Sequence, residues 1–438
     1  MAKRGTLIAP LCVGLAALVL ASPAGARTIA VTTTADEFGS SPGCALREAV
    51  QAANTDAAFG GCRGGNGPDT IALEEGEVYG RSLDGNGEDA NMMGDLDVAS
   101  RLEIRAVGGR ATLNANAMDR VLHVLPGGNL SLSKLVITGA SETYPSALVD
   151  GTGIFNGGEL NVTRSRIVGN ETLGNSSNNG GGIVNVGSAR LDHSKVAGNT
   201  AGNVGGGISQ YAGKLKIVDS TIEGNHADHV GGGIYAGGST FDPDRVTIKG
   251  STISGNSSGG DGGGLYVSLY GQNGDSDVAR LTNTTVSGNQ SDEDGGGVHQ
   301  FVGEVKLNAV TVTRNIADAD AGGSAGDGGG LDGSIAFRNS VVAKNRDLSA
   351  GNEVPDCGGG SQGHNVIGSA GDCFAAGSDV EVADPKLGPL ANNGGSTKTH
   401  ALRHGSAAIG RAGPGAPRKD QRGVRRDSDP DAGAFERR

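Results

Sequence analysis

The chain lacks tryptophan, and aromatic residues make up only 3% of its 438 residues. It also lacks an excess of basic residues, because 36 Lys and Arg face 48 Asp and Glu and the net charge is −12. Nucleic-acid binding needs basic patches that neutralise phosphate, so this balance excludes nucleic acid as a partner. An acidic surface is instead compatible with divalent cations.

Long apolar runs are absent after Ala26, so we expect no transmembrane segment. The segment 1–26 has the order of a secretory signal peptide. Lys3 and Arg4 supply a positive start, and the apolar run Leu7–Leu20 is too short to span a membrane. Ala24-Gly25-Ala26 is a small-residue cleavage site. We therefore expect this segment to be removed and the mature chain to be secreted, extracellular or in the cell envelope.

Glycine is abundant, with 80 residues. It follows no G-X-Y period, which excludes collagen, and regular repeats exclude a low-complexity segment. The repeats align on one asparagine per unit, and the units are roughly 30 residues long. The positions eight and three before each asparagine are always apolar. The aligned asparagines are Asn170, Asn199, Asn225, Asn256, Asn289, Asn315 and Asn345.

Each repeat offers three short apolar segments separated by turns. Two segments hold the apolar positions before the asparagine, and the third begins with the aliphatic residue that follows a glycine triplet, such as Ile234. Segments such as Val246-Thr247-Ile248 alternate with period two, which is typical of strands. Stacked repeats can bury apolar residues that one repeat cannot. We therefore predict an all-β fold, a right-handed parallel β-helix solenoid with three strands per coil, whose stacked asparagines link successive coils.

The open end of a solenoid exposes strand edges, so both ends need caps. Residues 44–54 have apolar positions at helical spacing and predict a short capping helix at the N-terminal end. We accordingly divide the mature chain into an N-terminal cap (27–100), β-helix repeats (101–348) and a C-terminal cap (349–438).

Four cysteines follow Ala26, and they form two local pairs. In an exported protein, local pairs predict disulfides, here Cys44 with Cys62 and Cys357 with Cys373. The alternative is a metal site with four thiolates. It would bring the two ends of a long solenoid together, whereas such sites use closely spaced ligands.

Both ends of the chain resemble motifs of exported bacterial β-helix proteins. Residues 44–50, Cys-Ala-Leu-Arg-Glu-Ala-Val, resemble the "CSLREAI" element and depart from it at Ala45 and Val50. The repeats resemble those of the pectin-lyase-like superfamily. This resemblance implies the β-helix fold, and it assigns no catalytic residue. The tail resembles the "choice-of-anchor Q" domain in residues 387–397, 400–402, 406–409, 420–423 and 431–436.

The residue after each aliphatic of the glycine-triplet strand is expected to point outward, as is the residue two positions further along. An exposed aromatic strip along a solenoid is a surface on which saccharides can stack. The alternative is that these residue types are simply favoured on a half-exposed sheet. The candidate ligand-binding residues at such positions are Tyr211, Tyr235, Tyr266, His299, Phe301 and Asp332.

An aspartate precedes three consecutive glycine triplets, at Asp261, Asp294 and Asp327. Stacking predicts three carboxylates within about 10 Å, and like charges that close repel unless a cation or protons relieve them. Ca²⁺, which prefers several oxygen ligands, is the cation we expect there. The alternative is that Asp-Gly is simply favoured in turns and that no cofactor is required.

These observations predict a non-catalytic, monomeric protein that presents a long surface to a polysaccharide or a cell-surface ligand. The regular repeats leave few long loops to wall a cleft, which favours binding over catalysis. The alternative is an extracellular polysaccharide lyase or glycoside hydrolase on the same scaffold. Carboxylates are too numerous to discriminate between the two, and fold alone does not license an activity.

Overall fold

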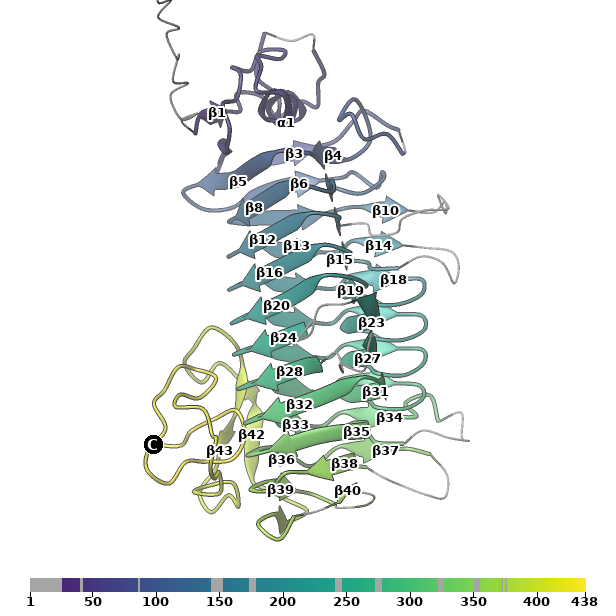
Figure 1. The fold of residues 1–438 in the computed structure, drawn as a ribbon, viewed down its shortest axis with the longest axis vertical. Helices are drawn as coiled ribbons and strands as arrows, with labels where there is room; N and C mark the ends of the chain where they lie inside the picture. The colour runs from purple at the N-terminus through teal and green to yellow at the C-terminus, as the bar shows by residue number, and fades with distance from the viewer. Residues whose placement is uncertain are drawn as a thin grey trace, which may run out of the picture.

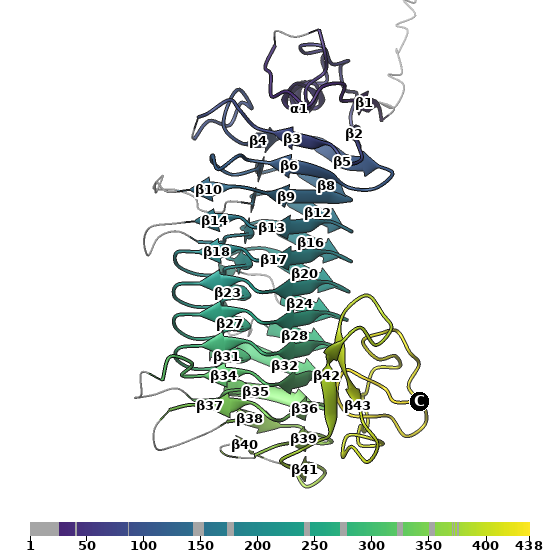
Figure 2. The ribbon, with the colours of Figure 1, turned by 180° about the vertical axis from the view of Figure 1, so that it is seen from behind.

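The computed structural model describes residues 26–39, 42–85, 87–142, 153–172, 179–240, 246–271, 278–321, 327–349, 355–369, 371, 373–374 and 376–438. Residues 1–25, which hold nearly all of the predicted signal peptide, lie outside this range. The described chain is one tall stack of coils, with a helix over one end and the C-terminal tail beside the other end (Figures 1 and 2). No helix in this part of the chain is long and apolar enough to cross a membrane.

The strands that follow the glycine triplets, together with their counterparts in the three coils before them, form the first column of the stack. Neighbouring strands of this column pair in parallel, and their aliphatic residues are in register. Ile208 pairs with Ile234, and Ile234 pairs with Leu265. All three side chains are fully buried. The strands of this column are β4 (Leu96–Val98), β7 (Leu122–Val124), β11 (Ile154–Asn156), β15 (Ile183–Asn185), β19 (Ile208–Gln210), β23 (Ile234–Thr240), β27 (Leu265–Gly271), β31 (Val298–Val302) and β35 (Leu331–Arg338).

A second column belongs to the same 21-stranded sheet and carries the apolar residues eight positions before the asparagines. Leu191 pairs with Ile217, and Ile217 pairs with Ile248. Its strands are β1 (Thr28–Ala30), β2 (Asp69–Glu74), β5 (Arg101–Val107), β8 (Asn129–Ser133), β12 (Glu159–Thr163), β16 (Ser188–Asp192), β20 (Lys214–Val218), β24 (Val246–Lys249), β28 (Val278–Thr282), β32 (Glu304–Asn308), the end of β35, β38 (Cys357–Ser361) and β40 (Cys373–Phe374).

The third column is a 12-stranded parallel sheet that carries the apolar residues three positions before the asparagines, such as Val196 paired with Ile222. Its strands are β3 (Val78–Gly80), β6 (Ala111–Asn114), β9 (Leu135–Thr138), β13 (Arg166–Val168), β17 (Lys195–Ala197), β21 (Thr221–Glu223), β25 (Thr252–Ser254), β29 (Thr285–Ser287), β33 (Thr311–Thr313), β36 (Val341–Val342), β39 (Val366–Ile367) and β41 (Val380–Glu381).

These three columns confirm the predicted parallel β-helix. The structure adds a short two-residue strand after each aligned asparagine, and one more after Ala140 in the preceding coil. These short strands form a separate eight-stranded sheet. They are β10 (Ser141–Glu142), β14 (Glu171–Thr172), β18 (Thr200–Ala201), β22 (His226–Ala227), β26 (Ser257–Ser258), β30 (Gln290–Ser291), β34 (Ile316–Ala317) and β37 (Arg346–Asp347).

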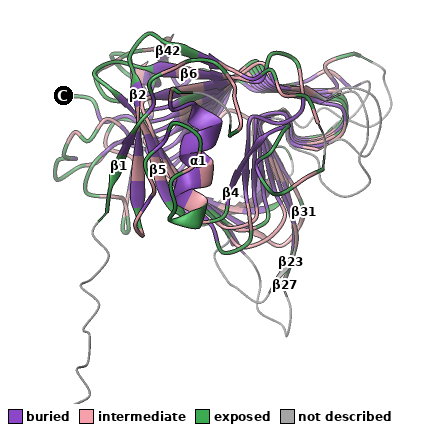
Figure 3. Cartoon of the chain, turned by 90° about the horizontal axis from the view of Figure 1, so that it is seen from above, coloured by how far each residue is buried: buried purple, intermediate pink, exposed green. Residues whose placement is uncertain are grey.

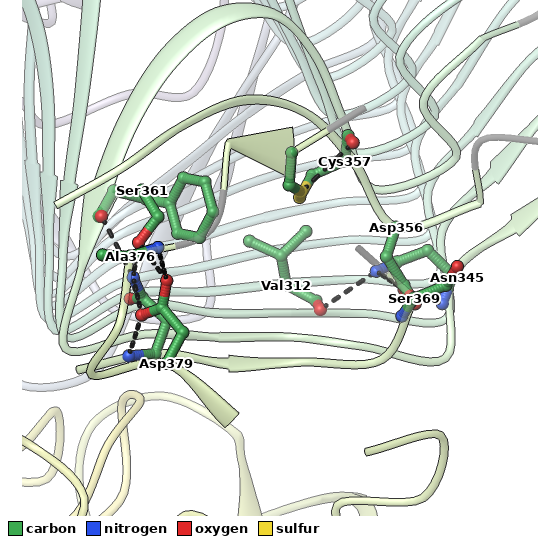
Figure 4. Close-up of a disulfide and its surroundings, with 11 residues drawn as sticks. Val312, Asn345, Asp356, Cys357, Ser361, Ser369, Ala376 and Asp379 are labelled. Atoms are coloured by element: carbon green, nitrogen blue, oxygen red, sulfur yellow. Dashed lines mark hydrogen bonds between the residues drawn. A yellow bond between two sulfur atoms is a disulfide. The ribbon is translucent and has the colours of Figure 1, made fainter. Parts of the chain in front are cut away.

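The asparagines form a buried ladder that links the coils, as predicted. The Nδ2 of Asn225 donates to the Oδ1 of Asn256 at 2.9 Å, and the Nδ2 of Asn256 donates to the Oδ1 of Asn289 at 2.9 Å. The ladder ends where the Nδ2 of Asn345 donates to the Oδ1 of Asp356 at 2.9 Å, immediately before β38 (Figure 4). Each amide thus spans the gap between two coils.

Helix α1 (Leu46–Thr55) lies across the N-terminal end of the stack, as predicted (Figure 3). Its buried face includes Ala49, Val50 and Ala53. Both predicted disulfides are present. Cys44–Cys62 adjoins the helix with a Cα–Cα distance of 4.5 Å, and Cys357–Cys373 joins β38 to β40 with a Cα–Cα distance of 5.6 Å (Figure 4).

The predicted C-terminal cap divides into two parts. Strands β38 to β41 continue the coils, whereas residues 387–438 lie against the side of the stack and contain the antiparallel pair β42 (Leu387–Ala391) and β43 (Thr399–Leu402) (Figure 2). The side chain of Thr285 in β29 donates to Gln421 at 2.7 Å, and that of Asn283 donates to the carbonyl of Lys419 at 2.7 Å. The tail therefore covers part of the third column.

Candidate ligand-binding column

The second residues of the first-column strands form a continuous outward column, because the parallel pairing places each beside its counterpart in the next coil. Tyr235 pairs with Tyr266, Tyr266 with His299, and His299 with Asp332. We call the whole series the outward column. It consists of Asp97, His123, Phe155, Val184, Ser209, Tyr235, Tyr266, His299 and Asp332.

The predicted aromatic residues do come together. The rings of Tyr235 and Tyr266 are stacked with centroids 5.7 Å apart and planes 9° apart, and those of Tyr266 and His299 are 5.2 Å and 6° apart. Tyr211 adjoins Tyr235 at 5.4 Å, and Phe301 lies 6.5 Å from Tyr266. Because the stacked rings face one another along the solenoid axis, their edges rather than their faces point outward.

The predicted ligand-binding residues are less exposed than the sequence suggested. Phe301 is 59% exposed, but His299 is buried, and Tyr235 and Tyr266 are half-buried. The cause is the glycine-triplet turn, whose backbone lies against the column. A Cβ at Gly295, where φ is +63°, would lie 2.6 Å from the Cβ of His299. Glycine is needed there both for the positive φ and for this close approach.

His299 lies among three carboxylates. Its Nδ1 is 2.8 Å from an oxygen of Asp332, and its Nε2 is 3.8 Å from an oxygen of Asp261. Neither ring nitrogen forms an aligned hydrogen bond within the described part of the chain. Burial works against the protonated ring, but the carboxylates of Asp332, Asp261 and Asp294 outweigh it and raise the pKa of His299.

The aspartates before the glycine triplets form a ladder of their own. The Oδ1 of Asp261 accepts the backbone N–H of Asp294 at 3.0 Å, and the Oδ1 of Asp294 accepts that of Asp327 at 2.7 Å. Burial, with repulsion from Asp332 and Asp261, raises the pKa of Asp294 to about 6. In Asp261 and in Asp294, one carboxylate oxygen therefore holds the next coil, and the other can bind a cation.

The potential metal ligands that come together in the structure differ from the predicted calcium ligands. Asp261, Asp294 and His299 each bring one ligand atom within 4.8 Å of the others, whereas the exposed Asp327 lies outside this group. Imidazole nitrogen with carboxylate oxygen suits Zn²⁺ or a related transition metal better than Ca²⁺, which prefers oxygen alone. Calcium at Asp261, Asp294 and Asp327 remains a prediction.

A second group of potential metal ligands, at the N-terminal end of the outward column, was not predicted from the sequence. Asp97 and His123 belong to the outward column, and Asp89 lies beside them. A sequence signal existed, because Leu96-Asp97-Val98 and Leu122-His123-Val124 share the apolar-polar-apolar pattern of Ile234-Tyr235-Ala236 and Leu265-Tyr266-Val267. These early coils lack the glycine triplet and the asparagine on which the repeats were aligned.

No family model matches the chain, and no curated protein matches it. Among solved structures it is similar to the crystal structure of pectate lyase Pel9A, with 16% sequence identity and a TM-score of 0.46. The match covers 94% of this chain and 96% of that chain. A likeness this distant carries no argument about activity or site.

Proposed function

We propose that this protein is a non-catalytic binding protein of the cell exterior and that it binds a polysaccharide along the outward column. The observation that carries the proposal is the run of neighbouring rings from Tyr211 to His299, on four successive coils. Four coils spaced at about 4.8 Å give a ligand surface about 14 Å long. The run ends on the acidic group around His299.

The ring geometry narrows the mode of binding. Stacked rings offer their edges and phenol groups, which donate and accept hydrogen bonds. Among the described ring-bearing residues predicted to bind ligand, only Phe301 is widely exposed. A saccharide would therefore contact the apolar side chain of Phe301 and form hydrogen bonds along the column. The carboxylates would repel an acidic polysaccharide unless a divalent cation at Asp261, Asp294 and His299 bridged the two.

An exterior location fits the two disulfides, because such bonds persist in oxidising compartments. The resemblance of the two ends to exported bacterial β-helix proteins belongs to the same proposal. That resemblance would imply a ligand on a cell surface or an anchoring role for the tail.

Phe301→Ala tests the proposal, because Phe301 is exposed and its removal should leave the fold intact. The matched control is Val107→Ala, which truncates an apolar side chain that is 53% exposed on β5, outside the outward column. Affinity electrophoresis against neutral and uronate polysaccharides, with divalent cation or chelator, measures binding. We expect Phe301→Ala to weaken retention about tenfold or more and Val107→Ala to leave it unchanged. Equal retention of both variants and the wild type, or no retention at all, would contradict the proposal.

One observation favours an enzymatic alternative. Asp294, with its pKa raised to about 6, and the His299–Asp332 pair form an acid and a base within one group. A polysaccharide lyase would release unsaturated, ultraviolet-absorbing products from uronate polymers, and a hydrolase would release reducing ends. Turnover of either kind that is lost in His299→Ala would replace the binding proposal with catalysis.

A further inference from the structure

Three potential metal ligands meet near the N-terminal cap, far along the column from His299. Asp97 lies in β4, His123 in β7, and Asp89 in the segment that precedes β4. One ligand atom from each lies within 4.8 Å of the others.

Two carboxylates converge on a single ring nitrogen in this group. The Nδ1 of His123 is 3.2 Å from Asp97 Oδ1 and 3.4 Å from Asp89 Oδ1. One imidazole nitrogen carries at most one hydrogen, so it cannot donate well to both. Neither His123 Nδ1 nor Asp97 Oδ1 forms an aligned hydrogen bond with any described residue, although the two side chains are only 9% and 0% exposed.

We propose that Asp89, Asp97 and His123 bind a transition-metal cation, with Zn²⁺ as the best fit. Tetrahedral zinc with bonds of about 2.0–2.1 Å separates neighbouring ligand atoms by about 3.3 Å, which matches the two observed separations. Carboxylate and imidazole ligands suit zinc, and two carboxylates balance its charge. The fourth position would open toward solvent on the side of Asp89, whose side chain is 68% exposed.

Hydrogen bonds hold Asp97 in place, and a ring contact holds His123. The other oxygen of Asp97 accepts the backbone N–H of Asn91 at 3.0 Å, and the Nδ2 of Asn91 donates to the carbonyl of Arg47 in α1 at 2.8 Å. The ring of Phe155 meets His123 edge to face at 5.1 Å. Such outer contacts orient ligands in metal sites.

The charges around the three ligands favour a bound cation. The neighbouring buried Asp95 has its own partner, because Arg120 Nε lies 2.7 Å from its Oδ2. Among the described residues, the ion-pair partner of both Asp89 and Asp97 is His123. The competing explanation is a protonated His123 shared by two carboxylates, without metal.

Zinc titration of the chelator-treated protein tests the proposal, with binding measured by calorimetry and metal content by mass spectrometry. All variants carry His299→Ala, which removes the other candidate group. Asp89→Asn changes an exposed ligand and should not disturb folding. The matched control is Asp84→Asn, an exposed aspartate a few residues away. We expect one Zn²⁺ per chain, at least tenfold weaker binding in Asp89→Asn and in His123→Ala, and no change in Asp84→Asn.

Co²⁺ gives a second readout, because its visible absorption reports tetrahedral coordination. We expect the tetrahedral bands in the His299→Ala parent and their loss in Asp89→Asn. Absence of stoichiometric zinc binding in that parent, or binding that survives Asp89→Asn unchanged, overturns the proposal in favour of the protonated histidine. The zinc titration does not depend on polysaccharide binding. The zinc proposal and the polysaccharide proposal can therefore be tested and rejected independently.

Discussion

At the scale of single residues, each ladder asparagine joins three coils. Asn256 is fully buried, and its Nδ2 donates to the carbonyl of Ile222 at 3.1 Å as well as to Asn289. Its Oδ1 accepts the backbone N–H of Asn225 at 3.0 Å. One amide therefore satisfies the polar groups of the coils on either side.

Asn256→Ala should lower the free energy of unfolding by about 3 kcal/mol, because each buried polar group left unpaired costs about 1–3 kcal/mol. Urea denaturation measures the loss. The control is Lys249→Ala, an exposed residue of the same coil, which should change stability by no more than about 0.5 kcal/mol. Similar small losses in both variants would show that water replaces the amide.

At the scale of elements, Arg47 joins the capping helix to the first coils. Its side chain is fully buried, and Nε lies 2.7 Å from Asp36. It also donates to the backbone carbonyls of Gly94 at 2.7 Å and Asp95 at 3.0 Å. A planar guanidinium can reach all three groups at once, which an ammonium cannot.

Arg47→Ala should destabilise the N-terminal cap by about 3–5 kcal/mol, because it leaves Asp36 buried without its partner. Hydrogen exchange should accelerate in β2 and β4 but not in β29, since each coil of a solenoid contacts only its neighbours. Arg47→Lys should not restore protection. Arg105→Ala, which removes a half-exposed arginine from β5, is the control. Loss of protection along the whole stack would contradict this local picture.

At the scale of the whole molecule, His400 connects the tail to the solenoid. It is 1% exposed, its Nδ1 donates to the carbonyl of Gly388 at 2.8 Å, and its Nε2 accepts from the hydroxyl of Ser287 in β29 at 2.9 Å. Burial, with repulsion from Arg314, lowers the pKa of His400 to about 4. The docked tail therefore requires a neutral ring.

Acidification should loosen the tail. Between pH 6.5 and 4 the unfolded state binds a proton that the folded state does not, so this stabilisation is present above pH 6.5 and lost as the pH falls toward 4. The loss should reach about 3 kcal/mol at pH 4. Thermal unfolding between pH 7 and 4 should show a shallower decline in His400→Gln than in the wild type. The exposed His404→Gln is the control. Parallel declines in all three proteins would rule out His400 as the cause.

The candidate site could be predicted in part. Apolar spacing set the strand register, so it correctly placed Tyr235, Tyr266 and His299 side by side. It could not show that a glycine turn buries His299, because that depends on how the turn folds over the strand. Apolar spacing also missed His123, because its coil lacks the asparagine and the glycine triplet on which the repeats were aligned.

Residue spacing along the chain was enough to predict the parallel β-helix, the asparagine ladder and the capping helix. A repeat that cannot bury its own apolar residues has to stack in register with its neighbours. The two disulfides were also predicted correctly, from the two local cysteine pairs. Three features became visible only in the folded chain. The tail lies beside the coils, His299 takes the place predicted for Asp327 beside Asp261 and Asp294, and Asp89 meets His123. These contacts join residues with no fixed separation in the chain, so they depend on how turns and tail pack in space.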